Sequence, residues 1–176
     1  AVIHSAAIVD WGTRPEQEVY GVNYTGTLNV IEACRQTGTR YMVFTSSVDA
    51  IYSGKAMTGL DESVPYPGKH PNMYCESKAL AEKLVLASNS AGLVTSALRP
   101  TDIYGPGDPF HIESLVEMAK GGFYVRLGNG TSRSQHTFVG NTAYAHVLLL
   151  SEQLKGNNKV PGSVYFITDG PASNFF

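Results

Sequence analysis

The chain has 176 residues with 43% hydrophobic and 16% charged content, enough apolar sequence for one ordinary globular core. Its formal net charge of −2 arises from mixed signs, which argues against a nucleic acid partner, and its five scattered histidines lack metal-ligand spacing. We therefore expect no bound metal. Two isolated cysteines indicate a reducing compartment, and no apolar run approaches the ~18 residues of a membrane-spanning helix, so we expect a cytoplasmic protein.

The first half of the chain alternates apolar runs of strand length with segments of helical spacing. Strands are predicted at residues 2–7, 41–44 and 93–98. The first helix is predicted to begin with Thr13 as the N-cap and Pro15 just inside it, and to stop at Gly38. A second long helix is predicted over residues 72–90, after a polar loop at residues 53–71.

The second half alternates less regularly and follows a segment rich in Gly and Pro at residues 99–109. Helices are predicted at residues 113–120 and 141–154, and strands at residues 123–127 and 164–168. The alternation of strands and helices along the chain argues for a parallel sheet with helices on both faces.

The strongest chemical signal is the YxxxK pattern at residues 74–78, because Tyr74 and Lys78 lie one turn apart on one face of a helix. A free phenol has a pKa of about 10, which is too high for an efficient base at neutral pH. A nearby ammonium favours the phenolate, and such a tyrosine exchanges a proton with a substrate hydroxyl or carbonyl. The pattern alone is weak evidence, since many helices contain it by chance.

Serine side chains follow the predicted strand at residues 41–44. Ser46 and Ser47 come at its carboxyl end, and in a parallel sheet these ends form the ligand crevice. A hydroxyl at this place forms a hydrogen bond with the reacting oxygen and holds it beside the tyrosine. A cap on the next turn is the simpler interpretation of two serines alone, so the functional one depends on their combination with Tyr74 and Lys78.

Several motifs, in this order along the chain, resemble those of the extended short-chain dehydrogenase/reductase family. The Ser-Tyr-Lys set resembles its catalytic triad, and HSAA at residues 4–7 is similar to its HxAA segment. NYTGT at residues 23–27 resembles its NxxGT segment, and LRPTDIYGPG at residues 98–107 is close to its LRPxxxYGPG loop. Each motif alone has an ordinary structural explanation, but the ordered combination is specific.

Three segments narrow the resemblance to 3β-hydroxysteroid dehydrogenases. FVGNTAYAH at residues 138–146 is similar to their YVGNVAWAH motif, YFITD at residues 165–169 resembles YFISD, and YCESKALAEK at residues 74–83 resembles YPxSKxxAEK. The resemblance implies a Rossmann-like, doubly wound parallel α/β sheet that is incomplete at its N-terminal side. It assigns residues 1–109 to the C-terminal part of a dinucleotide-binding domain. Residues 110–176 become part of a small substrate lobe, with elements that return to the main sheet.

The resemblance also implies roles for individual residues. Tyr74 takes the hydroxyl proton, Lys78 lowers the tyrosine pKa and holds the nicotinamide ribose, and Ser47 binds the reacting oxygen. Asn23 supports Lys78 through water, whereas His146 is expected to form structural hydrogen bonds rather than to shuttle protons. The cofactor-binding residues, besides Tyr74 and Lys78, are expected to be His4, Ala6, Ala7, Thr45, Ser46, Pro100 and Ile103. The expected cofactor is NAD or NADP, with NAD favoured, and the expected substrate is an apolar alcohol or ketone.

The glycine-rich fingerprint that holds the pyrophosphate in this family is not found in the sequence. We therefore expect further sequence before this segment and more of the substrate lobe after it. The leading hypothesis is NAD(P)-dependent oxidation of a 3β-hydroxysteroid or sterol-like alcohol by a homo-oligomer, with membrane association of the whole protein left open. The alternatives are a nucleotide-sugar epimerase or dehydratase, a carbonyl reductase of the same group, or a non-catalytic remnant.

We expect the 176-residue chain alone to bind nicotinamide nucleotides weakly or not at all, because no segment offers a helix N-terminus together with close glycine backbone. The apolar segment at residues 2–7 also predicts an exposed sheet edge that promotes self-association. Isothermal titration with NAD and NADP measures the affinity. A dissociation constant in the micromolar range would show that the fingerprint is dispensable.

Overall fold

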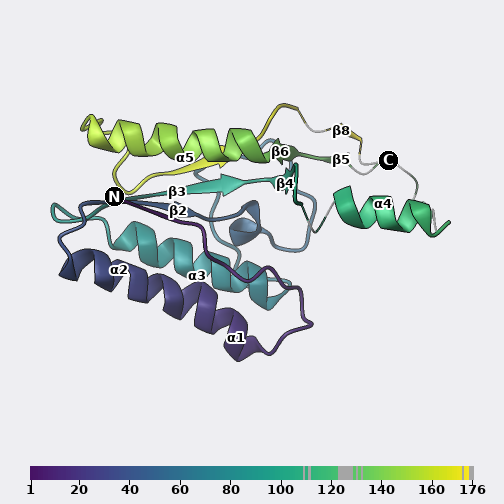
Figure 1. Cartoon of the computed structure of the whole chain (residues 1–176), viewed down its shortest axis with the longest axis horizontal. Coiled ribbons are helices and arrows are strands. Elements are labelled where there is room, and N and C mark those ends of the chain that lie inside the picture. The colour runs from purple at the N-terminus through teal and green to yellow at the C-terminus, as the bar shows by residue number, and fades with distance from the viewer. Residues whose placement is uncertain are drawn as a thin grey trace.

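The structure is a computed structural model that describes residues 1–108, 110, 112–122, 129, 131, 133–171 and 173–174. Its centre is a parallel sheet in the order β1-β2-β3-β7 (Figure 1). The four strands are β1 (Val2–His4), β2 (Tyr41–Thr45), β3 (Val94–Pro100) and β7 (Val164–Ile167). The predicted parallel α/β sheet is therefore confirmed, with β1 at one edge and β7 at the other.

Helices cover both faces of this sheet (Figure 1). One face carries α1 (Glu16–Tyr20), α2 (Gly26–Gln36) and α3 (Met73–Ala87), and the other carries α5 (Val139–Leu154). Between α1 and α2 the chain makes a π-helical turn at Gly21–Thr25, so these elements form one continuous helical segment. This arrangement is the doubly wound layering that the alternating sequence predicts.

Alternate side chains of β2 point to opposite faces of the sheet, as the period of a strand requires. Met42 and Phe44 belong to a buried cluster that includes Ile31 from α2 and Val85 from α3. Val43 belongs to a second cluster, together with residues of β3 and α5. Side chains on both faces of β2 are therefore packed in apolar clusters. This packing fixes the position of the strand, and with it the position of its carboxyl end.

The remaining elements lie beyond the carboxyl ends of β2 and β3. They comprise a 3₁₀ turn (Val48–Ile51), β4 (Asp102–Tyr104), α4 (Ile112–Lys120), β5 (Arg133–Ser134), β6 (His136–Phe138) and β8 (Ser173–Asn174). β4 pairs with β6 in parallel, and β5 pairs with β8 in antiparallel orientation. The strand predicted at residues 123–127 falls outside the described residues. Among the helices that are described, none has the length and apolar character needed to cross a membrane.

The predicted start of the first helix is wrong. Helix α1 begins at Glu16, Pro15 is the residue before it, and no side chain caps its N-terminus. The hydroxyl of Thr13 donates instead to the carboxylate of Asp10, which also accepts hydrogen bonds from three backbone N–H groups. Asp10 therefore competes successfully for the side chain that the sequence pattern assigned to the helix. The first strand is also shorter than predicted, because it ends at His4.

A buried ion pair joins α3 to the sheet. Glu82 and Arg99 are 0% and 2% exposed, and Arg99 Nη2 lies 2.6 Å from Glu82 Oε1. Arg99 Nε donates to both carboxylate oxygens, at 3.2 and 3.0 Å. The hydroxyl of Tyr66 donates to Oε1 at 2.5 Å. The guanidinium carbon of Arg99 lies 5.6 and 5.5 Å from the ring centroids of Tyr66 and Phe166. This cluster connects α3, β3, β7 and the loop before α3.

We expect Glu82→Gln to lower the free energy of unfolding by about 3–5 kcal/mol, because it leaves the buried guanidinium without its counter-ion. Glu32→Gln is the matched control, since Glu32 pairs with Arg35 at 2.5 Å on α2 and both side chains are 47% exposed. An exposed pair of this kind contributes about 0–1 kcal/mol. Urea unfolding of both variants measures the difference, and equal small losses would contradict a structural role for the buried pair.

Candidate active site

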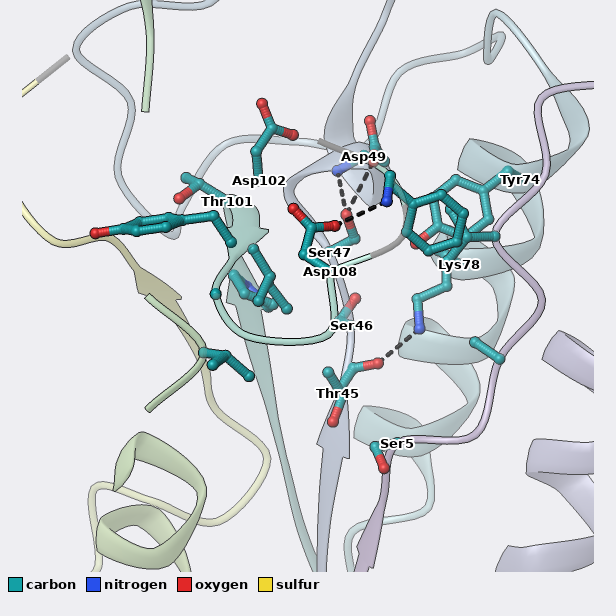
Figure 2. A pocket seen from close by; sticks show the side chains of 18 of the residues that line it. Ser5, Thr45, Ser46, Ser47, Asp49, Tyr74, Lys78, Thr101, Asp102 and Asp108 are labelled. Carbon is teal, nitrogen blue, oxygen red and sulfur yellow. Dashed lines mark hydrogen bonds between the residues drawn. The ribbon is translucent and has the colours of Figure 1, made fainter. Parts of the chain in front are cut away.

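A cavity of about 360 Å³ opens at the carboxyl ends of β2 and β3 (Figure 2). Most residues that the sequence assigns to the site line it: Ala7, Thr45, Ser46, Ser47, Tyr74, Lys78, Pro100 and Ile103. These side chains come from the segment after β1, the end of β2 and the residues after it, the end of β3, strand β4 and helix α3. The structure thus brings together residues that lie more than 90 positions apart, from Ala7 to Ile103.

Three of the expected site residues do not line the cavity. His4 is buried beneath the site, where its Nε2 lies 2.9 Å from Thr27 Oγ1 and its ring lies 5.5 Å from that of Phe44. Ala6 is exposed, whereas its neighbours Ser5 and Ala7 line the cavity. Asn23 is buried behind the segment that follows β1.

Asn23 lies in the π-helical turn and ties three segments together. Its amide Nδ2 donates to Ile8 O at 2.9 Å and to Ser77 Oγ at 3.0 Å, while its Oδ1 accepts from Ile8 N at 2.7 Å. Both amide hydrogens are therefore committed. In this structure Asn23 holds the segment after β1 against α3, beside Lys78, rather than contacting the lysine directly.

Lys78 is almost fully buried, with 3% exposure. Its Nζ donates to the carbonyl oxygen of Thr45 at 2.6 Å (Figure 2). The same Nζ lies 4.6 Å from the centroid of the Phe44 ring. Burial lowers the pKa of Lys78 to about 8, although Glu82 and Asp49 oppose this change. The amine of Lys78 is thus held at the end of β2, in the cavity. Its pKa of about 8 lies close to neutral pH.

The pKa of Tyr74 is raised, not lowered as the sequence led us to expect. Burial is the largest cause, and the charge of Asp49 adds to it, whereas a hydrogen-bonding interaction with Ser47 opposes both. The Lys78 ammonium does not offset these causes, because it binds the carbonyl of Thr45. In the structure as it stands, the phenol is therefore the favoured form of Tyr74 at neutral pH.

His146 supports the same strand end from the opposite face of the sheet. Its Nε2 lies 2.6 Å from Thr45 Oγ1, and its Nδ1 lies 2.7 Å from Thr142 O on its own helix. The residue is 6% exposed, and both of its ring nitrogens lie within hydrogen-bond distance of groups of the protein. A continuous chain of contacts therefore runs from α5 through Thr45 to Lys78.

Some residues of the site carry no motif in the sequence. Asp49 lines the cavity two residues after Ser47 and binds its hydroxyl, but a single acid in a turn gives no signal by itself. Trp11 and Phe110 also line the cavity and form an edge-to-face pair with centroids 6.3 Å apart. Residues that come from separate irregular segments are not detectable by periodicity. The rings of Trp11 and Phe110 give this part of the cavity lining an apolar surface.

A sheet of this topology, with a tyrosine and a lysine one turn apart facing a cavity at its strand ends, defines an extended short-chain dehydrogenase/reductase. Within that class, the family model for the 3-beta hydroxysteroid dehydrogenase/isomerase family matches residues 1–176. The chain belongs to this family, and the resemblance drawn from its motifs is confirmed.

Named relatives agree with this assignment. The chain is 38% identical to sterol-4-alpha-carboxylate 3-dehydrogenase erg26, decarboxylating, of Schizosaccharomyces pombe, over 99% of this chain and 51% of that protein. It is 39% identical to 3 beta-hydroxysteroid dehydrogenase type 7 of Homo sapiens, over 96% of this chain and 49% of that protein. The chain therefore spans about half the length of these relatives.

A solved structure shares the fold and holds a nicotinamide cofactor. It is MoeE5 in complex with UDP-glucose and NAD, which matches with a TM-score of 0.78 and 28% identity. The match covers 98% of this chain and 57% of that one. The Rossmann-type sheet inferred from the sequence is thereby confirmed, and it corresponds to part of a larger fold.

We expect stability to depend on pH through Lys78. Its folded-state pKa of about 8 lies below the ordinary value of 10.5, so the unfolded chain binds more protons between these two pH values. The free energy of unfolding therefore rises with pH across this window. Lys78→Met removes the rise, and urea unfolding at several pH values measures it. Lys83→Met is the control, because Lys83 lies on the exposed side of the same helix, and it should keep the rise. The same dependence of the free energy of unfolding on pH in the parent chain and in both variants would contradict the prediction.

Proposed function

We propose that the whole protein is an NAD(P)-dependent oxidoreductase of a secondary alcohol. The proposed substrate is the 3β-hydroxyl of a steroid or sterol-like molecule. The observation that carries the proposal is the meeting of Ser47, Tyr74 and Lys78 in one cavity. The names of the relatives, which are sterol and steroid dehydrogenases, support the choice of substrate.

The cavity offers a partner for a bound cofactor at Ser46. This residue is 3% exposed, and its Oγ has no hydrogen-bond partner within the described part of the chain. A buried hydroxyl without a partner is costly, and a polar ligand group relieves that cost. The residues that would hold a nicotinamide nucleotide are Ala7, Thr45, Ser46, Lys78, Pro100 and Ile103. When bound, the nicotinamide exchanges a hydride with the alcohol carbon. NAD is proposed over NADP, although the solved structures that share the fold include one with NAD, MoeE5, and one with NADPH.

The side chains supply the proton chemistry. In the oxidative direction, the phenolate of Tyr74 accepts the proton of the substrate hydroxyl at its Oη, and in reduction the phenol returns it. The raised pKa of Tyr74 requires a positive charge nearby before the phenolate forms, and Lys78 is the cation of the cavity that shares its helix. Ser47 binds the reacting oxygen from the strand end. The apolar rings of Trp11 and Phe110 suit a substrate with an apolar body.

A nucleotide-sugar epimerase or dehydratase is the second candidate, because MoeE5 shares the fold and binds UDP-glucose. The test is turnover by the purified whole protein, followed by the absorbance of the reduced cofactor. We expect a 3β-hydroxysteroid to be oxidised with NAD or NADP. Turnover of a UDP-sugar without turnover of any steroid would favour the second candidate and overturn the first.

We expect Tyr74→Phe to lower kcat by ~10²–10⁴-fold, the contribution of one general acid or base. Binding of the nucleotide should survive, because the substitution removes only the hydroxyl. Tyr144→Phe is the matched control, since Tyr144 is 67% exposed on α5 and lies outside the cavity lining. Near-normal turnover by Tyr74→Phe would refute the assigned role.

A further inference from the structure

Asp49 is the acid of the cavity that directly contacts the Ser47 side chain (Figure 2). The hydroxyl of Ser47 donates to Asp49 Oδ2 at 3.0 Å, and the backbone N–H of Asp49 donates to Ser47 Oγ at 3.1 Å. Both contacts arise because Ser47 caps the 3₁₀ turn Val48–Ile51, in which Asp49 is the second residue. The geometry is therefore fixed by the backbone.

The hydrogen-bond capacity of Ser47 is limited, because a hydroxyl has one proton and two lone pairs. With Asp49 ionised, the proton goes to the carboxylate and one lone pair accepts from the Asp49 N–H. Only one lone pair then remains for Tyr74, whose side chain also interacts with Ser47, and for a ligand in the cavity, so Ser47 acts toward both as an acceptor. A carbonyl oxygen, which also only accepts, gains nothing from it.

Protonation of Asp49 reverses this situation. A neutral carboxyl donates to the second lone pair of Ser47, and the serine proton is released to point into the cavity. No covalent bond of Ser47 changes, since its hydroxyl only rotates. We propose that Asp49 is a positioning residue whose protonation state decides whether Ser47 donates a hydrogen bond to the reacting oxygen. The inference rests on the proposed function, because it takes that oxygen to be the one bound by Ser47 and Tyr74.

The surroundings of Asp49 allow such a switch. Groups on α3 face it: Cys75 Sγ lies 3.9 Å from its Oδ1, and the charges of Tyr74 and Lys78 interact with it. Asp102 on β4 also acts on it, Asp108 lines the same cavity, and Arg99 on β3 is bound by Glu82. Burial is the main cause that raises the pKa of Asp49, with Asp102 adding to it, and the bonds from Ser47 and Cys75 and the charge of Lys78 oppose the rise.

The test is the pH dependence of kcat/KM for ketone reduction by the whole protein, from about pH 5 to about pH 9. As pH rises through the Asp49 ionisation, the rate should fall by up to ~10²-fold, the cost of losing one donor to the reacting oxygen. Asp49→Asn should abolish this step, because its amide does not titrate. A purely structural role would instead lower the rate at every pH and leave the step in place, which would overturn the proposal.

Asp61→Asn is the matched control. The Asp61 carboxylate also accepts from the N–H and hydroxyl of a serine, Ser63, at 2.9 and 2.5 Å, but on an exposed loop outside the cavity lining. This variant should keep both the rate and the pH step of the parent protein. Loss of the step in Asp61→Asn would assign it to another source and contradict the proposal.

A second measurement is independent of turnover. Carbon NMR of labelled Asp carboxyl groups, assigned with Asp49→Asn, follows the titration of Asp49 without substrate. Ser47→Ala should raise the Asp49 pKa, because it removes a hydrogen bond that favours the carboxylate. An unchanged titration would overturn the coupling between the two residues. A shifted titration in a protein that reduces no ketone would support the coupling and place the failure in the proposed function.

Discussion

The buried pair of Glu82 and Arg99 is the interaction on which the rest of the molecule depends. Each of these buried charges needs the other as its counter-ion, because neither has access to water. The pair therefore fixes the position of α3 relative to β3. Tyr74, Lys78 and Glu82 follow one another at intervals of four residues along α3, and they share one face of that helix. The same contact that orders the fold therefore also sets where the tyrosine and lysine meet the strand ends.

The site is assembled from backbone as much as from side chains. Lys78 binds the carbonyl of Thr45, whose side chain contacts His146 on the other face of the sheet. Helices from both layers therefore converge on the last residue of β2. This explains why a motif near residue 146, distant in sequence from the tyrosine and lysine, belongs to the same functional unit: it supports the strand end to which the lysine is attached.

The sequence predicted the parallel sheet and its helices, and most of the site residues that it named line the cavity, because long periodic segments and the YxxxK pattern are local signals. It did not predict the contact between Thr13 and Asp10 or that between Ser47 and Asp49. In both cases a hydroxyl can bind either backbone groups or a nearby carboxylate, and the sequence does not show which of them it binds. The direction of the Tyr74 pKa shift was also wrong. Spacing gives the proximity of Lys78, but burial and the orientation of its ammonium appear only in three dimensions.

The π-helical turn at Gly21–Thr25 has a further consequence for the helical phase of this segment. Such a turn holds one more residue than an α-helical turn, and each residue of an α-helix advances the rotation by ~100°. The residues of α1 are therefore out of phase with those of α2, and Asn23 faces inward at the point where the phase changes. Deletion of one residue here would restore a regular helix but rotate Asn23 away from Ser77. Sequence comparisons that follow a single helical period across this segment would therefore assign the wrong buried face to one of its two halves.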